Sequence, residues 1–559
     1  MLSPARRTLL AALAAITLAA CSKDQAPTDP LAYVPADTPY LFANRTPMPR
    51  EALEAWTKMY GVRIEDLYAD LAKDPELLKI EGEFGEWLRA ALPEVGKLAS
   101  PGGMDALGLK SDGRIAIYGF GLMPVYRMQL ADAAKFAETV ARIEGRSGRK
   151  LATRKFGEHT LWQFANDKAQ VVFGPIGDFL VASVAPANAD EARLSAQLGL
   201  SLPERSIASN EALAELDQKN GFDGHFSGYL DVRSLAQRLT GRNQDDAAVI
   251  AAFGGEVPKL SDACTSELDA MTAKFPRVIF GTTTFDAKRM NVASIVEMEP
   301  GLAASLQKIA APIPGSAAED AVMLRFAAAV DLPEAMRFLN GVADAIGAAP
   351  YQCEELKGIN DSAAELKQNL ANPGLAMAGA MNALHFGLED VTIDRGSEMP
   401  SKLSAYMTIG SSSPLMLWGF AQQGVPALAQ LTLSTDGKIV SLPADAFPMP
   451  IPLELKAVMT AKSLGVATRD IADASFSAAA DVPASGDGTV LRYGFSGRFF
   501  KLMADNMPAA DAGMEEQERR EMERGVAIIR AMGDSVKMMD VRMQLTARGI
   551  EMVQSNELN

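Results

Sequence analysis

The segment Thr284-Phe285-Asp286-Ala287-Lys288-Arg289-Met290-Asn291-Val292 returns in altered form as Gln544-Leu545-Thr546-Ala547-Arg548-Gly549-Ile550-Glu551-Met552. In each segment a strand pattern leads into an Ala-Lys or Ala-Arg turn, and a second strand pattern follows. Strands joined by so short a turn pair antiparallel. One hairpin that occurs twice in a chain indicates an internal repeat.

Four further pairs of segments match in the same order along the chain. They are Ala36–Ala43 with Ala318–Phe326, Met104–Leu107 with Met381–Leu384, Met123-Pro124 with Met399-Pro400, and Ser227–Leu235 with Arg492–Phe500. The first pair leads on to Met48-Pro49 and Leu332-Pro333, and the numbering offsets fall steadily, from 284 for Pro49 and Pro333 through 277, 276 and 265 to 260 for Ala287 and Ala547. A duplication with deletions in the second copy gives such a series, although strand–helix proteins also share short local patterns. The sequence therefore predicts one unit used twice, near residues 32–300 and 301–559.

Within the first copy, strand and helix patterns follow one another. Short apolar runs with β-branched and aromatic residues predict strands, and apolar residues at helical spacing predict helices. The expected order is strands near 114–118 and 125–130, a helix over 133–143, strands near 150–156, 160–164, 170–173 and 179–184, and a helix over 190–198. The predicted fold class is α+β, with an internally duplicated unit of antiparallel β-sheet and helices packed on one face.

The other face of the sheet is expected to be either solvated or a binding surface. Val541–Thr546 alternates regularly between apolar and polar residues, so at least there one face of the sheet is exposed to solvent. An apolar groove lined by Met and Phe would favour a lipid ligand, and a flat exposed face would favour a protein partner. Two helical insertions are expected, within Leu53–Leu92 and over Glu515–Met532.

Composition limits the functional classes. The chain has 559 residues, 48% of them hydrophobic and 22% charged, which excludes disorder as the whole answer. The net charge of −16 argues against nucleic acid as a partner, because phosphate binding needs a basic surface. With 3 Cys and 3 His there is little material for a metal site, and no cofactor is expected.

The first twenty residues have the pattern of a secretory signal peptide. Arg6-Arg7 precedes an apolar run, Thr8–Ala20, which is too short to span a bilayer. The run ends Leu18-Ala19-Ala20-Cys21, which resembles the bacterial lipobox. That resemblance implies acylation of Cys21 and a membrane anchor through the N-terminal acyl chains. Residues 21–31 are polar with prolines and predict a tether.

The resemblance also implies a location. Ser22, rather than Asp, follows Cys21, and this favours the outer membrane over the inner membrane. We expect the protein to be lipid-anchored there, on the periplasmic face. In an oxidising compartment the two remaining cysteines, Cys264 and Cys353, are expected to form a disulfide, with two buried free thiols as the alternative.

A search for catalytic motifs finds none. The sequence has no Gly-x-Ser-x-Gly elbow, no phosphate-binding loop and no His-Glu-x-x-His. The histidines His159, His225 and His385 are scattered and do not recur between the copies. No catalytic or metal-ligating residue is therefore named, although a pair of carboxylates close in space would leave no sequence signal.

Methionines crowd the C-terminal part of the chain, nine of them between Met503 and Met552. Such flexible side chains usually fill irregular cores, and they also line adaptable apolar binding surfaces. The opening Tyr33–Ala43, with its Pro-Ala-Asp-Thr followed by a strand, resembles a loose group of uncharacterised bacterial exported lipoproteins, which carries no activity to transfer.

Three functions are then in competition. The leading hypothesis is a lipid-anchored envelope protein that binds an envelope protein or an apolar ligand without catalysis. The second is a carboxylate-dependent hydrolase acting on an envelope polymer, and the third is a structural spacer.

Overall fold

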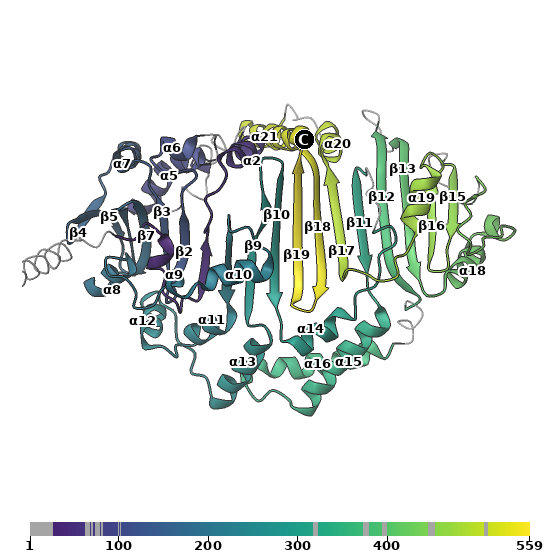
Figure 1. Ribbon diagram of the computed structural model, residues 1–559, viewed down its shortest axis with the longest axis horizontal. Coiled ribbons are helices and arrows are strands. Elements are labelled where there is room, and N and C mark those ends of the chain that lie inside the picture. The colour runs from purple at the N-terminus through teal and green to yellow at the C-terminus, as the bar shows by residue number, and fades with distance from the viewer. Residues whose placement is uncertain are drawn as a thin grey trace, which may run out of the picture.

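The computed structural model describes residues 26–559 except 62–67, 69–70, 73–78, 80–81, 99, 101, 317–321, 373–378, 394–399, 445, 447–452 and 508–512. Within these residues, 19 strands join into one sheet that extends along the long axis of the molecule (Figure 1). Neighbouring strands pair antiparallel throughout. The predicted α+β class with a large antiparallel sheet is confirmed.

The first half of the chain contributes the following elements. They are η1 (Pro30–Tyr33), β1 (Tyr40–Ala43), α2 (Arg50–Gly61), α5 (Gly82–Lys97), α6 (Gly103–Ala106), β2 (Ile115–Phe120), β3 (Met123–Gln129), α7 (Ala133–Ser147), β4 (Ala152–Phe156), β5 (His159–Ala165), β6 (Ala169–Ile176), β7 (Phe179–Pro186), α8 (Glu191–Gln197), α9 (Ile207–Asn210), α10 (Ala212–Asn220), β8 (Ser227–Asp231), α11 (Val232–Leu239), α12 (Gln244–Ala252), α13 (Asp262–Lys274), β9 (Arg277–Phe285) and β10 (Arg289–Glu297). Strands β2–β7 and helices α7 and α8 follow the predicted order.

In this half β1 lies between β2 and β8. On one side the sheet continues from β2 through β3, β7, β6 and β5 to β4. On the other side it continues from β8 through β9 to β10. The connection from β3 to β4 passes through α7, and the connection from β7 to β8 passes through α8, α9 and α10.

The second half of the chain contributes the remaining elements. They are α14 (Pro300–Gln307), β11 (Leu324–Ala329), α15 (Leu332–Ala348), η2 (Glu354–Leu356), α16 (Lys357–Leu370), β12 (Met381–Ile393), β13 (Pro400–Ser411), α18 (Pro414–Gly424), η3 (Pro426–Leu428), β14 (Val440–Ser441), β15 (Leu455–Met459), β16 (Ser463–Thr468), α19 (Asp473–Ala480), β17 (Thr489–Ser496), α20 (Gly497–Asn506), α21 (Glu516–Ser535), β18 (Val536–Thr546) and β19 (Gly549–Leu558).

Here β11 lies between β12 and β17. The sheet continues from β12 through β13, β16 and β15 to β14, and from β17 through β18 to β19. The pairing order outward from β11 is the order outward from β1, except that the short strand β14 stands where β5 and β4 do.

The two halves meet at the centre of the sheet, where β10 pairs with β19 from Arg289 opposite Glu557 to Glu297 opposite Gly549. Helices close both ends of this junction (Figure 1). At one end α2 contacts α21, with Trp56 in an apolar cluster that includes residues of β18 and β19. At the other end α13 contacts η2 of the second half.

The main core lies on one face of the sheet, which we call the covered face. In the first half α8, α9 and α10 cover it, and Leu194, Ile207 and Leu216 pack there against strand residues such as Ile279 and Ile295. In the second half α19 lies on the same face, over β13, β15 and β16. Other helices gather beyond the strand ends, α2, α20 and α21 at one end and α13–α16 at the other (Figure 1).

Three details differ from the sequence-based expectations. Met104–Leu107 was matched with Met381–Leu384, but Met104 lies in the helix α6 and Met381 begins the strand β12. Gly102 has a left-handed φ of 72° and a Cβ on Gly103 would lie 1.7 Å from a backbone oxygen, so the chain turns sharply there. Of the matched pair Met399-Pro400, Met399 lies outside the described residues, and Pro400 begins β13.

The third difference concerns the tether predicted over 21–31, whose described part begins at Ala26. Its last residues belong to the folded part of the chain, because Pro30 and Leu31 are in η1. Asp29 forms an ion pair with Arg114 at 2.8 Å, and the Tyr33 hydroxyl donates to the Pro27 carbonyl at 3.1 Å. The free part of the tether is therefore shorter than predicted.

Candidate functional site

The sheet face opposite the covered face is apolar and partly exposed across the middle of the molecule, and we call it the open face. One row of cross-strand neighbours crosses twelve strands, from β13 to β3. Its members are Ile409, Leu384, Ala328, Leu491, Met543, Met552, Ser294, Phe280, Gly228, Phe42, Ile117 and Tyr126. The row carries no charged side chain.

A second row runs beside the first in the second half of the chain. It consists of Met407, Phe386, Phe326, Tyr493 and Val541. Phe326 is 38% exposed, Met407 43%, and Met552 of the first row 51%. Large apolar side chains in these two rows therefore meet solvent, whereas those on the covered face of the first half are fully buried.

Helices cover the open face near its two ends and also reach inner strands, because α6 and α7 pack beside Tyr126 and α14 packs beside Met543. Near β5 and β6, Trp87 of α5 contacts Phe164 and Phe173, with ring centroids 4.5 Å and 5.9 Å apart. Near β15 and β16, α18 and η3 pack through Trp418 and Leu428. Between these contacts Phe326, Met407 and Met552 remain exposed.

The arrangement suits the burial of apolar surface. Contiguous exposed apolar area on a soluble protein usually marks a binding surface, because leaving it in water costs about 25 cal/mol per Å². At the β3 end of the row, burial raises the pKa of Tyr126 to about 12, so its phenol stays neutral at physiological pH. Its hydroxyl lies 2.9 Å from the Met128 sulfur.

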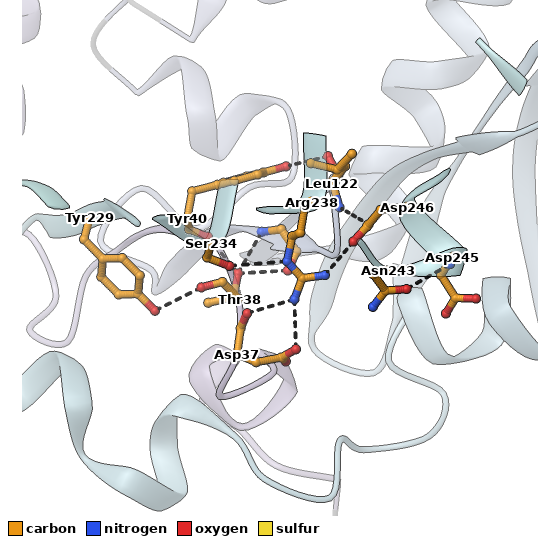
Figure 2. Close-up of polar contacts among 11 residues, drawn as sticks. Asp37, Thr38, Tyr40, Leu122, Tyr229, Ser234, Arg238, Asn243, Asp245 and Asp246 are labelled. Atoms are coloured by element: carbon orange, nitrogen blue, oxygen red, sulfur yellow. Dashed lines mark hydrogen bonds and ion pairs between the residues drawn. The ribbon is translucent and has the colours of Figure 1, made fainter. Parts of the chain in front are cut away.

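A polar cluster in the first half is centred on Arg238 of α11 (Figure 2). Its Nη2 donates to the Asp37 carboxylate at 2.9 Å, and its Nη1 donates to Asp246 at 3.0 Å. Asp246 is buried and also accepts the Leu122 N–H at 3.2 Å. A cavity of about 340 Å³ lies beside the cluster, but Arg238 stands between the two carboxylates. The cluster joins the segment before β1 to α12 and to the β2–β3 turn.

Thr38, next to Asp37, has a similar structural role (Figure 2). Its hydroxyl accepts the Gly119 N–H at 3.0 Å and lies 2.8 Å from the carbonyl oxygens of Gly119 and Tyr40. Burial raises the pKa of Tyr40 to about 12, and its hydroxyl donates to the Leu122 carbonyl at 3.3 Å. The Pro-Ala-Asp-Thr segment thus fastens β1 to its neighbours.

The predicted cysteine pair is confirmed in position. The sulfurs of Cys264 and Cys353 lie 2.19 Å apart, at disulfide distance, and both residues are buried. The pair joins α13 of the first half to the segment before η2 of the second half. The Glu267 carboxylate accepts the N–H groups of Gln352 and Cys353 at 2.7 Å and 2.9 Å, which holds the same two segments together. Cys21 lies outside the described residues.

The three histidines lie in different parts of the fold, and so do the C-terminal methionines. His159 begins β5, His225 Nδ1 lies 3.0 Å from the Pro47 carbonyl oxygen, to which it can only donate, and His385 is buried beside Tyr406. Of the C-terminal methionines, Met539, Met543 and Met552 lie on the open face, and Met539 packs there with Met532 of α21 in the cluster around Trp56. Both interpretations of the methionines therefore apply.

The open face was visible in the sequence only in part. The alternation at Val541–Thr546 showed that one side of this strand is polar, but not which side lies under helices. Leu384-His385-Phe386-Gly387-Leu388 shows similar alternation and is a second signal of this face. No family model, no curated protein and no solved structure matches this chain.

Proposed function

We propose that this protein is a lipid-anchored cell-envelope protein that acts by binding another envelope protein through the open face, without catalysing a reaction. The apolar row across twelve strands is the observation that carries the proposal. A broad sheet surface suits the extended apolar surface of a partner protein. An acyl chain is held better in an enclosed cavity, where most of the ligand surface is buried.

The anchor in this proposal is the acylated Cys21, which would hold the protein at the outer membrane on its periplasmic face. The support is the lipobox-like Leu18-Ala19-Ala20-Cys21 followed by Ser22. Since η1 begins at Pro30, the tether reaches at most roughly 30 Å from Cys21. Among the described residues, no helix has the length and apolarity needed to cross a bilayer.

We further propose that the body is an internal duplication, with units near 32–300 and 301–559. The shared pairing order of the strands supports it. So does the junction, where Ala293 pairs with Val553. Those two residues occupy the same position when the alignment of the two hairpins is extended, which is what a two-fold relation between the copies requires.

Site-specific crosslinking tests the binding proposal. The photoreactive residue p-benzoylphenylalanine replaces Phe326, Met407 or Met552 in the full acylated chain, in living cells. Leu239 of α11 and Leu415 of α18, which are exposed and lie away from the two rows, serve as matched controls. We expect the three open-face positions to crosslink to one and the same envelope protein and the two controls not to do so.

Other outcomes would overturn the proposal. Crosslinks to lipid alone would make the ligand apolar and small, and an absence of crosslinks from the face would favour a spacer. The anchor has its own test, because Cys21→Ser should release the protein from the membrane fraction. A Cys21→Ser chain that stays membrane-bound after extraction with high salt would contradict the acyl anchor.

A further inference from the structure

In the second half of the chain, part of the covered face has no described helix over it. A cavity of about 860 Å³ opens there over β11, β17, β18 and β19, beside the start of α20. In Figure 1 none of the described helices crosses β17–β19 between their ends. Four charged residues form the cavity floor: Arg325 of β11, Arg492 of β17, and Asp540 and Arg542 of β18.

The floor residues share one carboxylate. Arg492 Nε donates to Asp540 Oδ2 and Arg542 Nε donates to Asp540 Oδ1, each at 2.9 Å, and Arg325 Nη1 lies 3.9 Å from Asp540 Oδ2. Asp540 is 6% exposed and Arg325 is 8% exposed. Burial lowers the pKa of Arg492, and the neighbouring Arg325 lowers it further. Among the described residues of the floor, positive charge exceeds negative charge by two.

The basic residues at the cavity rim have partners of their own. Lys501 pairs with Asp534 at 2.9 Å, and Lys537 pairs with Glu557 at 2.8 Å. The positive surplus is therefore concentrated on the floor. Glu94 likewise has three cationic neighbours around one carboxylate. Its partners Lys97, Arg142 and Arg146 are each more than a third exposed. Water solvates the surplus there, whereas the guanidiniums of Arg325 and Arg492 are largely removed from it, and only Arg542, with a side chain 41% exposed, is solvated to a similar degree.

The first half shows how the cavity arises. Pairing register places Arg325, Gly494 and Asp540 in one cross-strand row, as it places Leu41, Tyr229 and Ile279 in the first half. In the next cross-strand row, Arg542 of the second half occupies the position that Gly281 occupies in the first half. The Phe222 ring packs directly on Gly281. Helix α10 covers the first-half rows. In the first half, the segment between α8 and β8 spans residues 198–226 and contains the covering helix. In the second half, the corresponding segment between α19 and β17 is much shorter and spans only residues 481–488.

Two changes therefore occur together. No described helix covers this region, and the apolar floor of the first half is replaced by a charged one. If the cover alone were missing, apolar residues would be left in water. If the floor alone had changed, charges would lie under a helix. The combination leaves a space that is open to solvent, has a buried polar floor and carries a positive surplus.

We propose that this cavity binds the phosphate monoester group of a ligand, held by Arg325, Arg492 and Arg542. A monoester carries about −1.5 to −2 charge at pH 7, which matches the surplus of two on the floor better than a carboxylate or a phosphodiester does. Guanidinium groups bind phosphate oxygens in bidentate fashion, and here they come from three different strands. The site lies on the opposite side of the sheet from the open face and is independent of the proposed protein partner.

Calorimetric titration of the mature chain with glycerol phosphate tests the site. We expect saturable binding that Arg492→Gln or Arg542→Gln weakens at least tenfold. Arg469→Gln, an exposed position in the same half that pairs with Glu454, should bind like the parent. Arg542 is the more exposed of the two floor positions, so it keeps the test available if Arg492→Gln unfolds. Equal binding by all four proteins, or no binding by the parent, would overturn the proposal.

A pH series adds a signature that structural loss cannot imitate. The monoester loses its second charge near pH 6, so affinity should fall roughly tenfold from pH 7.5 to pH 5. Sulfate stays doubly charged and controls for the titratable groups around the cavity. These groups are Asp540, Glu557, Asp534, Lys501, Lys537, Arg498 and the floor arginines. A matching fall for sulfate would overturn the assignment to a phosphate monoester.

Two further ligands distinguish the source of the group. Dihexanoyl phosphatidic acid carries the monoester on a lipid, and glucose 6-phosphate carries it on a sugar. Tighter binding of the first would identify a lipid headgroup, and equal binding would identify the phosphate alone as the recognised feature. Acetate that binds as tightly as glycerol phosphate would contradict the proposal.

Discussion

Strands β8–β10 and β17–β19 occupy matching places in the sheet, yet they present opposite chemistry on the covered face. Under α10, Ile279 and Ile295 are buried among apolar neighbours. In the second half, Asp540 is equally inaccessible but is surrounded by arginines. The contrast teaches that strand pairing alone does not dictate which side chains a sheet carries. Around Ile279 the floor lies under α10 and is apolar, whereas around Asp540 no described helix lies above the floor and it is charged.

The largest effect is expected when a residue of the second-half floor is placed at the matching position in the first half. Ile279→Asp places the second-half carboxylate under α10, where no arginine stands opposite. An unpaired buried charge costs about 3–5 kcal/mol, so we expect a loss of about 4 kcal/mol in unfolding free energy. Urea unfolding followed by circular dichroism measures it. A loss below about 1 kcal/mol would mean that α10 does not seal the first-half floor.

The next effect concerns the link between the halves. Replacing Cys264 and Cys353 together by Ser opens a loop whose ends are 89 residues apart. The chain-entropy model predicts a loss of about 4 kcal/mol. Reduction of the parent protein should give the same shift in the urea midpoint, and reduction should not affect the double variant. A double variant as stable as the oxidised parent would show that the helices at this end hold together without the sulfurs.

A smaller effect is expected from Asp540→Asn in the cavity. It leaves Arg492 and Arg542 with a neutral partner, which should cost about 1–3 kcal/mol. Added sulfate should raise the melting temperature of this variant more than that of the parent, because the anion replaces the lost carboxylate. Equal shifts in both proteins would argue that the floor arginines do not attract anions.

The smallest effect belongs to Glu94, the first-half carboxylate with three cationic neighbours. Burial alone would raise its pKa, but hydrogen bonds from Arg142, Arg146 and Lys97 outweigh burial and lower the pKa to about 2. A lowered folded-state pKa gives stability that is full above pH 4.5 and is lost as the pH falls towards 2.

Glu94→Gln should therefore lose about 1–2 kcal/mol at pH 7, a figure reduced because the cations are solvated. The difference from the parent should shrink as the pH falls from 4.5 to 2. Thermal unfolding across this range measures it. A difference that stays constant with pH would show that the charge of Glu94 contributes nothing.

Much of the fold could be predicted because its signals are local. The strands around Val125 and Val172 and the helix around Val140 follow from short-range periodicity, and both hairpins follow from their turns. The match of Met104 with Met381 failed because glycines at 102 and 103 set the backbone there, and residue identity alone did not reveal it.

The sites were harder to predict because they depend on what lies above the sheet. Arg492 and Arg542 are ordinary charged residues in strand patterns, and what distinguishes them is that no described helix lies above them. The cysteine pair was predictable because chemistry leaves two thiols few alternatives. The open face depends on where helices pack, which the alternation of Val541–Thr546 does not specify.

The pairing of β10 with β19 has a consequence for biogenesis. A chain synthesised from its N-terminus completes β10 about 250 residues before β19, so the central strand of the sheet has an unpaired edge while the intervening polypeptide emerges. Exposed edges of this kind recruit other strands, including those of identical neighbours. Protection of this edge until β19 arrives would then govern the yield of correctly assembled protein more than the stability of the finished fold does.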